Sequence, residues 1–183
     1  VERRGINLGE GGGFALLERG ASAGAWLLGY GESSDAHHMS SPHPEGLGAR
    51  LALEDALRRA RLDASQIDYI NLHGTASQRN DEVEAHLVAK IFDKDTFASS
   101  TKGWTGHTLG AAGIVEAAIT LIALEEGLLP GTLNTTVLDA NCGEQIQRDN
   151  ADRPASRALS FSFGFGGSNC VLALGRSDLA VAS

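Results

Sequence analysis

Two histidines and one lysine stand in short polar segments that are rich in small residues. His73 lies in "HGT" (73–75), and Lys102 and His107 lie in "KGWTGH" (102–107). A neutral imidazole N–H can donate a hydrogen bond to an oxygen that gains charge during a reaction, and such donors in a dry site usually make the largest catalytic contribution. These three side chains are therefore candidates for stabilising an oxygen that becomes negatively charged during a reaction.

Taken singly, each of these residues has an ordinary structural explanation. His73 could be a strand-end histidine satisfied by backbone groups, Lys102 a solvated loop lysine, and His107 the cap of the helix pattern that follows. The glycines of "GFGG" (164–167) could supply positive φ in a hairpin. Only their joint arrangement along the chain favours chemistry over structure.

All three polar segments stand at the ends of predicted strands. Short strands are predicted at 67–72 and 96–101, and they end directly before His73 and Lys102. The third segment, "GFGGSN" (164–169), separates the two strands of a C-terminal pair. Because α/β proteins commonly gather their sites at strand ends, we expect the three loops to converge on one pocket.

Helical periodicity predicts the elements that hold these strands. One helix is predicted at 46–61, a second begins at a cap formed by Asn80 or Asp81, and a third covers 109–126. The third is apolar almost all round, so we expect a central helix packed on both sides. Strands are predicted at 7–20, 25–35, 67–72, 96–101, 157–163 and 168–175.

Composition agrees with an α/β protein and argues against other classes. The 183 residues are 42% hydrophobic and include 23 glycines, which favours one turn-rich domain over a helical bundle. A net charge of −8 without a basic cluster argues against nucleic-acid binding. The longest apolar run, 109–124, is too short for a membrane span and contains Glu116. We expect a cytoplasmic protein without a secretory leader.

The two cysteines show no pattern of their own. Cys142 and Cys170 have neither C-x-x-C spacing nor the even framework of bridges typical of a small secreted domain. We expect two reduced thiols, and no metal site is predicted.

Read together, the motifs closely resemble the carboxy-terminal half of a β-ketoacyl-acyl-carrier-protein synthase of the thiolase superfamily. The resemblance rests on "NLHGTASQRNDEVEA", "SSTKGWTGHTLGAAGIVEA" and "FSFGFGGSN", and the earlier "GINLGEGGGFALLE" and "SSDAHHMSSPHPEG" agree with it. It covers essentially the whole chain, residues 1–183. It implies an α/β thiolase-like half, with a mixed β-sheet packed with helices on its faces.

The resemblance also implies a decarboxylative Claisen condensation. In such enzymes a cysteine carries an acyl chain as a thioester, and malonyl on a carrier protein loses CO₂ to give an enolate that attacks it. The family's two catalytic histidines fall on His73 and His107, and its lysine, which holds a histidine in position, falls on Lys102. Glu116 falls on the lysine's partner, and pairing would explain a carboxylate in an apolar helix.

Further positions are implied for the rest of the substrate. Thr75 matches the threonine that hydrogen-bonds the phosphopantetheine arm, and Ser77 stands where many members have a second threonine. Phe165 matches the aromatic gate over the acyl pocket and an oxyanion-hole N–H, with Gly164 and Gly166 beside it. The substrates would arrive on the phosphopantetheine of acyl carrier protein, and no other cofactor is implied.

The nucleophile departs from the family pattern. The family's cysteine lies upstream of "GINLGE", and neither Cys142 nor Cys170 matches it. We expect an enzyme fragment of fatty acid or polyketide synthesis that is inactive without an amino-terminal half and forms a homodimer in the complete enzyme. The alternative is a non-catalytic half that binds a carrier protein or partner subunit. Retention of His73, Lys102 and His107 favours the enzyme.

Overall fold

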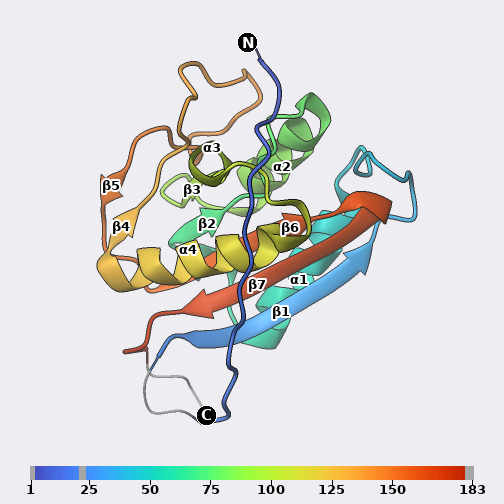
Figure 1. The fold of residues 1–183 in the computed structure, drawn as a ribbon. Helices are drawn as coiled ribbons and strands as arrows, with labels where there is room; N and C mark the ends of the chain where they lie inside the picture. Colours follow the sequence, from blue (N-terminus) through green and yellow to red (C-terminus); the bar gives the residue numbers. More distant parts are fainter. Residues whose placement is uncertain (1–2, 21–23, 180–183) are drawn as a thin grey trace.

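Five strands form the mixed sheet at the centre of the molecule (Figure 1), and the computed structural model describes residues 3–20 and 24–179. The strands are β1 (Trp26–Ser34), β2 (Tyr69–Asn71), β3 (Phe97–Ser99), β6 (Arg157–Phe163) and β7 (Ser168–Gly175). Their order across the sheet is β1-β7-β6-β2-β3. Strand β2 is parallel to both of its neighbours, whereas β7 is antiparallel to both of its own.

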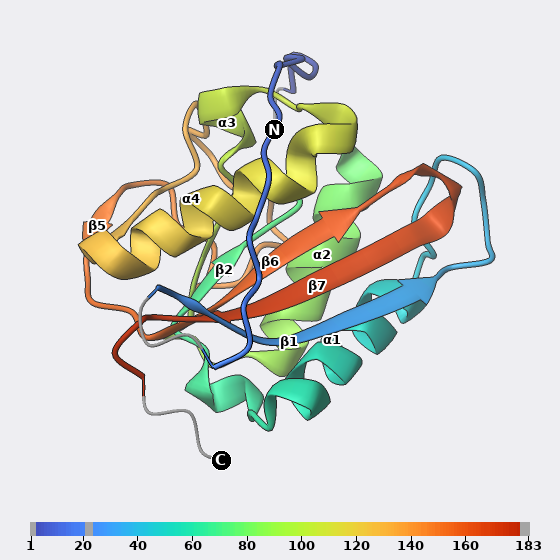
Figure 2. The ribbon, with the colours of Figure 1, turned by 60° about the horizontal axis from the view of Figure 1, so that its bottom comes forward.

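Helices cover both faces of the sheet (Figure 2). On one face lie α1 (Leu47–Ala60) and α2 (Gln78–Ile91), and on the other lies α4 (Ala112–Glu126). This arrangement confirms the predicted α/β fold with a mixed sheet. The short helical segments are Ala64–Gln66, α3 (Lys102–Thr105), Leu109–Ala111 and Phe165–Gly167.

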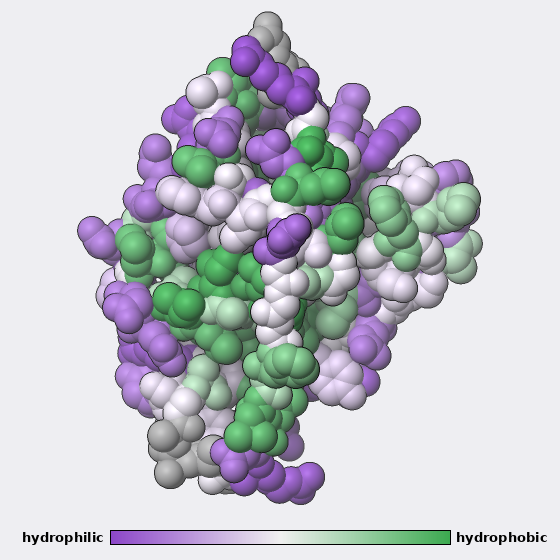
Figure 3. Space-filling model, in the orientation of Figure 1, coloured by the Kyte–Doolittle hydropathy of each residue, from purple (hydrophilic) through white to green (hydrophobic). Residues whose placement is uncertain are grey.

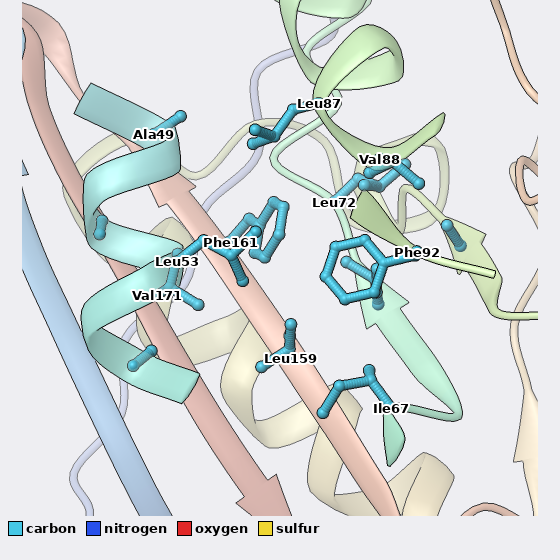
Figure 4. Close-up of a cluster of buried hydrophobic side chains, with 14 of the residues drawn as sticks. Ala49, Leu53, Ile67, Leu72, Leu87, Val88, Phe92, Leu159, Phe161 and Val171 are labelled. Atoms are coloured by element: carbon cyan, nitrogen blue, oxygen red, sulfur yellow. The ribbon is translucent and has the colours of Figure 1, made fainter. Parts of the chain in front are cut away.

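Each face of the sheet has its own apolar core. Side chains alternate along β6, so that Leu159 and Phe161 belong to the core under α1 and α2 while Ala158 belongs to the core under α4. Figure 4 shows the first of these cores, with Leu53 of α1 and Val88 of α2 beside the sheet. The two cores hold in place the helices that flank the polar segments.

Small residues let α1 lie very close to the edge strand β1. A Cβ at Gly29 would stand 2.6 Å from the carbonyl oxygen of Ala56, and one at Gly31 would overlap the carbonyl of Ala52. Both positions therefore require glycine for reasons of space, which explains the two glycines of "GYG" within β1.

The prediction of a strand at 7–20 is wrong. Within the described residues of this segment, only Leu8 makes a β-bridge, and its partner is His107 rather than a strand of the sheet. The edge of the sheet is β1 itself. Phe14, Leu16 and Leu17 remain exposed, so strand-like patterning is present without a strand to pair with.

Two other boundaries differ from the prediction. Helix α2 begins at Gln78 with Ser77 at its cap position, so both predicted caps, Asn80 and Asp81, lie inside the helix. The Asn80 side chain donates to Glu84, and the Asp81 side chain accepts from Arg3. A small second sheet pairs β4 (Leu128–Leu129) with β5 (Ala151–Asp152), in a stretch for which the sequence predicts only a loop.

Among the described residues, the sheet supplies one of the two packing surfaces expected for helix α4, and the N-terminal segment crosses the other side of the helix. Glu116 and Thr120 lie on its buried side, whereas Ile122 is 57% exposed. Figure 3 shows hydrophobic surface gathered over α4 and along the N-terminal segment that crosses it. Among the described residues, no helix combines the length and apolarity that a membrane crossing requires.

Candidate functional site

The site begins where two parallel strands end side by side. Asn71 of β2 is in register with Ser99 of β3, so the segments that follow them leave the sheet at the same edge. His73 comes from the first and Lys102, the first residue of α3, from the second. The Lys102 Nζ lies 3.3 Å from the His73 Nδ1 and also donates to the His73 carbonyl oxygen. Sheet register thus brings these two predicted residues together.

Lys102 and Glu116 form a buried ion pair, as the sequence predicts. Their side chains are 7% and 2% exposed, and the Nζ donates to the Glu116 Oε1. Burial raises the pKa of the Glu116 carboxyl to about 7, and the neighbouring Lys102 charge acts in the opposite direction. With His73 Nδ1, the His73 carbonyl and Glu116, the ammonium has an acceptor for each of its three N–H bonds.

The two histidine rings face each other at the end of this network. The centroids of His73 and His107 are 5.5 Å apart and the rings are nearly perpendicular, at 85°. Burial lowers the pKa of His73 well below its ordinary value, and the charges of Lys102 and His107 lower it further. Burial and the Lys102 charge also lower the pKa of His107. Both rings are therefore neutral at neutral pH.

Hydrogen bonding assigns the tautomer of each ring. The His107 Nδ1 accepts from the backbone N–H of Leu109 at 3.2 Å, and the His73 Nδ1 faces an ammonium that can only donate. An Nδ1 that accepts leaves the proton on Nε2. Neither Nε2 has a hydrogen-bond partner among the described residues, so the pair offers two N–H donors to a bound oxygen.

Glu84 belongs to this site, although the sequence analysis assigns it no role. Its carboxylate is 2% exposed and accepts from the backbone N–H of His73 at 2.6 Å, from that of Gly74 at 2.7 Å, and from Asn80 Nδ2 at 3.0 Å. Burial raises its pKa to about 7. A glutamate on the same helical face as Leu87 and other apolar residues is the signal that could have identified it, as it did for Glu116.

The third loop reaches the histidines through a different aromatic residue from the one predicted. Phe163, the last residue of β6, packs its ring 5.7 Å from His73. The predicted Phe165 is 80% exposed, on a turn where Gly166 has φ +81° and donates its N–H to the Met39 carbonyl oxygen. Gly164 N–H bonds back to Ser168. Within the described residues, no ring contact joins Phe165 to either histidine.

Two hydroxyl groups lie at the surface just after His73. Ser77 is exposed and Thr75 is half-buried, and their side-chain oxygens are 2.9 Å apart. Both remain accessible for a hydrogen bond from outside.

Neither cysteine has the environment of an activated nucleophile. Burial raises the pKa of both Cys142 and Cys170, whereas a reactive thiol needs a lowered one. Over the described ranges, no cluster of three or more His, Cys, Asp or Glu side chains could hold a metal ion.

Sequence comparisons place these features among known proteins. A family model described as the C-terminal domain of β-ketoacyl synthases matches residues 24–136. A mitochondrial 3-oxoacyl-[acyl-carrier-protein] synthase of Arabidopsis thaliana is 41% identical over 93% of this chain and 40% of its own length. The 3-oxoacyl-[acyl-carrier-protein] synthase 2 of Vibrio cholerae is 39% identical over 92% of this chain and 44% of its own length. The chain thus spans less than half the length of these relatives.

Solved structures agree with the predicted thiolase-like fold. A ketosynthase in complex with its chain length factor, from Xenorhabdus doucetiae, matches with a TM-score of 0.79 and 43% identity, over 83% of this chain and 39% of that one. A β-ketoacyl synthase from Burkholderia phymatum matches with a TM-score of 0.77 and 37% identity, over 83% and 37%.

Proposed function

Since the chain belongs to the β-ketoacyl synthase family through that family's C-terminal domain, we propose that it supplies two oxyanion-stabilising histidines to a decarboxylative Claisen condensation. The substrates are a malonyl group on the phosphopantetheine of acyl carrier protein and an acyl group held as a thioester on a cysteine. The product is a 3-oxoacyl thioester on the carrier protein, in fatty acid or polyketide synthesis.

The observation that carries this proposal is the perpendicular pair of neutral rings, each with its proton on Nε2. In the reaction the bond between C2 and the carboxylate of the malonyl group breaks, CO₂ leaves, and the electron pair moves towards the thioester oxygen. His73 and His107 donate their two N–H groups to that oxygen. C2 then attacks the acyl carbon, the new carbon–carbon bond forms, and the cysteine thiolate leaves.

Lys102 acts on this reaction through the histidines. Its ammonium fixes the His73 ring by the Nδ1 contact, and its charge lowers the pKa of both rings, so that each stays neutral and keeps its donor on Nε2. Glu116 balances the lysine charge inside the protein. Lys102 and Glu116 are therefore positioning residues in this proposal.

The remaining predicted residues are proposed to contact the phosphopantetheine arm and the acyl chain of the substrates. The hydroxyls of half-buried Thr75 and exposed Ser77 are available to bind the phosphopantetheine arm. The exposed Phe165 ring and the adjacent Gly164 and Gly166 form a turn suited to gating the acyl pocket.

We assign the nucleophile to another part of the enzyme, because neither thiol of this chain has a lowered pKa. The chain covers only 40% of the Arabidopsis thaliana relative and 44% of the Vibrio cholerae relative, which leaves room for such a part. Exposed apolar residues support its docking here, notably Ile122 on α4 and Phe14, Leu16 and Leu17 in the N-terminal segment. The complete enzyme is proposed to be a homodimer that receives acyl carrier protein.

Reconstitution tests the proposal. The chain alone, given acyl and malonyl carrier proteins, should make no 3-oxoacyl product, and adding a nucleophile-bearing half by co-expression or as one continuous chain should restore it. Steady product formation by the pure chain would mean that the nucleophile is misplaced. A reconstituted protein that binds carrier protein but never decarboxylates malonyl would instead identify the non-catalytic half.

A further inference from the structure

The N-terminal segment crosses the site and holds the backbone of His107. We call residues 3–13 the strap; Figures 1 and 2 show it in dark blue, running across α4. The His107 N–H donates to the Asn7 carbonyl oxygen at 2.8 Å, and the Gly9 N–H donates to the His107 carbonyl oxygen at 3.1 Å. Leu8, between them, forms a parallel bridge with His107. Both backbone hydrogen-bonding groups of this histidine are therefore engaged by the strap.

His107 needs this support because it stands between two helical segments. It follows α3 and Gly106, whose φ of +71° ends the helix, and it precedes the short turn Leu109–Ala111. The position of its ring relative to His73 is set by the backbone at this junction.

The contact between strap and junction leaves no space for a side chain. A Cβ at Gly9 would overlap the carbonyl oxygen of Thr105, and a Cβ at Gly106 would lie 2.8 Å from the Gly9 nitrogen. Gly9 has no left-handed φ, so steric overlap alone requires glycine there. At Gly12, three residues further on, a Cβ would meet nothing within 4 Å, and the φ of this residue is not left-handed either.

The strap is fixed on both sides of this contact. Arg3 forms ion pairs with Asp81 of α2, at 3.0 Å, and with Asp139. Beyond the contact, Gly11 lies against the Val115 side chain of α4. A strap held at both ends can hold the residue that it contacts.

We propose that Gly9 is a positioning residue for His107: the strap sets the place and the tautomer of this histidine through the close contact at Gly9. A larger residue at position 9 lifts the strap from the junction, breaks its two backbone hydrogen bonds to His107 and loosens the Leu109 N–H bond to Nδ1. The inference rests on the proposed function only for its catalytic consequence.

Side-chain NMR of the histidines in the isolated chain tests the positioning directly. In the parent protein, His107 should be protonated on Nε2. In Gly9→Ala, His107 should show a mixture of tautomers, and its pKa should rise towards the ordinary value as the ring moves away from Lys102 and from its buried place. The tautomer of His73 should not change. Gly12→Ala is the matched control and should leave both rings as in the parent. An unchanged His107 in Gly9→Ala overturns the proposal.

If Gly9→Ala does not fold, amide hydrogen exchange of the parent protein can test whether the strap holds His107. The amide protons of His107 and Gly9 should exchange more slowly than that of Gly12, for which no hydrogen bond is found in the described part of the chain. Equal exchange at the three positions would show that the strap does not hold the junction.

Activity of the reconstituted enzyme separates this inference from the proposed function. Gly9→Ala should lower malonyl decarboxylation by roughly 10²-fold, the loss that a displacement of about 1 Å can cause, while Gly12→Ala keeps the parent rate. If the parent enzyme itself does not decarboxylate malonyl, the proposed function fails, but the NMR result still decides the role of Gly9.

Discussion

The Lys102 ammonium links a carboxylate of α4, Glu116, to the His73 ring at the end of β2, and both side chains of the ion pair are buried. Removing one partner of such a pair leaves an uncompensated charge. We therefore expect Glu116→Ala to lower the free energy of unfolding by about 3–5 kcal/mol, as measured by urea denaturation. Glu126→Ala, an exposed change at the end of the same helix, is the control and should stay within about 0.5 kcal/mol. A loss below about 1 kcal/mol for Glu116→Ala would mean that water reaches the pair.

The two histidines should be needed for decarboxylation but not for acyl loading. In the reconstituted enzyme, His73→Ala and His107→Ala should each slow the release of CO₂ from malonyl carrier protein by roughly 10²-fold or more, the cost of losing one oxyanion donor. Labelled acyl groups should still load onto the cysteine. His86→Ala, at an exposed position of α2, is the matched control. If both His73→Ala and His107→Ala decarboxylate malonyl carrier protein at the parent rate, the two histidines have only a structural role.

Acidification should destabilise the fold through the same rings. The unfolded chain takes up protons on histidine near pH 6.5, whereas the lowered pKa values of His73 and His107 keep both rings neutral in the folded protein. The unfolded state then binds more protons, so stability is present above pH 6.5 and is lost as pH falls from there towards the folded-state pKa of each ring. For the buried His73 the loss is up to about 1.4 kcal/mol per pH unit, and solvent screening makes it smaller for His107. In urea titrations at several pH values, the free energy of unfolding of His73→Asn should fall less steeply with decreasing pH than that of the parent. An equal slope in parent and variant would contradict the lowered pKa of His73.

Glu84 should hold the turn that carries His73. In Glu84→Gln one carboxylate oxygen becomes an NH₂ group, which faces a backbone N–H of His73 or Gly74 and leaves it without an acceptor. We expect a loss of about 1–3 kcal/mol in thermal or urea unfolding, together with slower decarboxylation in the reconstituted enzyme. Glu82→Gln, on the same helix but beside solvent-exposed Arg79, should change stability by less than about 0.5 kcal/mol. Equal effects of the two substitutions would remove Glu84 from the site.

The cysteines of this chain should be dispensable. Burial raises the pKa of both thiols, so Cys142→Ser combined with Cys170→Ser should leave the rate of 3-oxoacyl formation by the reconstituted enzyme unchanged. The measurement is product formation together with acyl loading. Loss of acyl loading in the double variant, with folding intact, would place the nucleophile in this chain.

The sequence predicts the position of the site better than its supporting contacts. His73 and Lys102 follow short apolar strands directly, and parallel neighbouring strands deliver such residues to one edge whatever the details of packing. That Glu116 needs a partner is also predictable, since a carboxylate on an apolar helix must be compensated. Its partner, Lys102, is implied by the resemblance to the family, whereas the other inferences depend on local patterns and on sheet geometry.

Other features depend on contacts between distant segments, which periodicity does not describe. The strand pattern at 7–20 lacks a neighbouring strand, so the segment instead lies across α4 and bonds to His107. Phe163 and Phe165 share the same strand-to-turn pattern, but only Phe163 packs against the core beside His73, whereas Phe165 is exposed. Helical spacing places Glu84 on the apolar face of α2, but its partners, the backbone N–H groups of His73 and Gly74, are known only from the structure.

The saturation of the Lys102 ammonium has a consequence for the chemical survival of the site. A primary amine beside an activated thioester is readily acylated when its nitrogen carries a lone pair. Here the protein supplies an acceptor for each of the three N–H bonds of the ammonium. In the proposed function, an ammonium held in this way would lie next to acyl donors through many turnovers without attacking them.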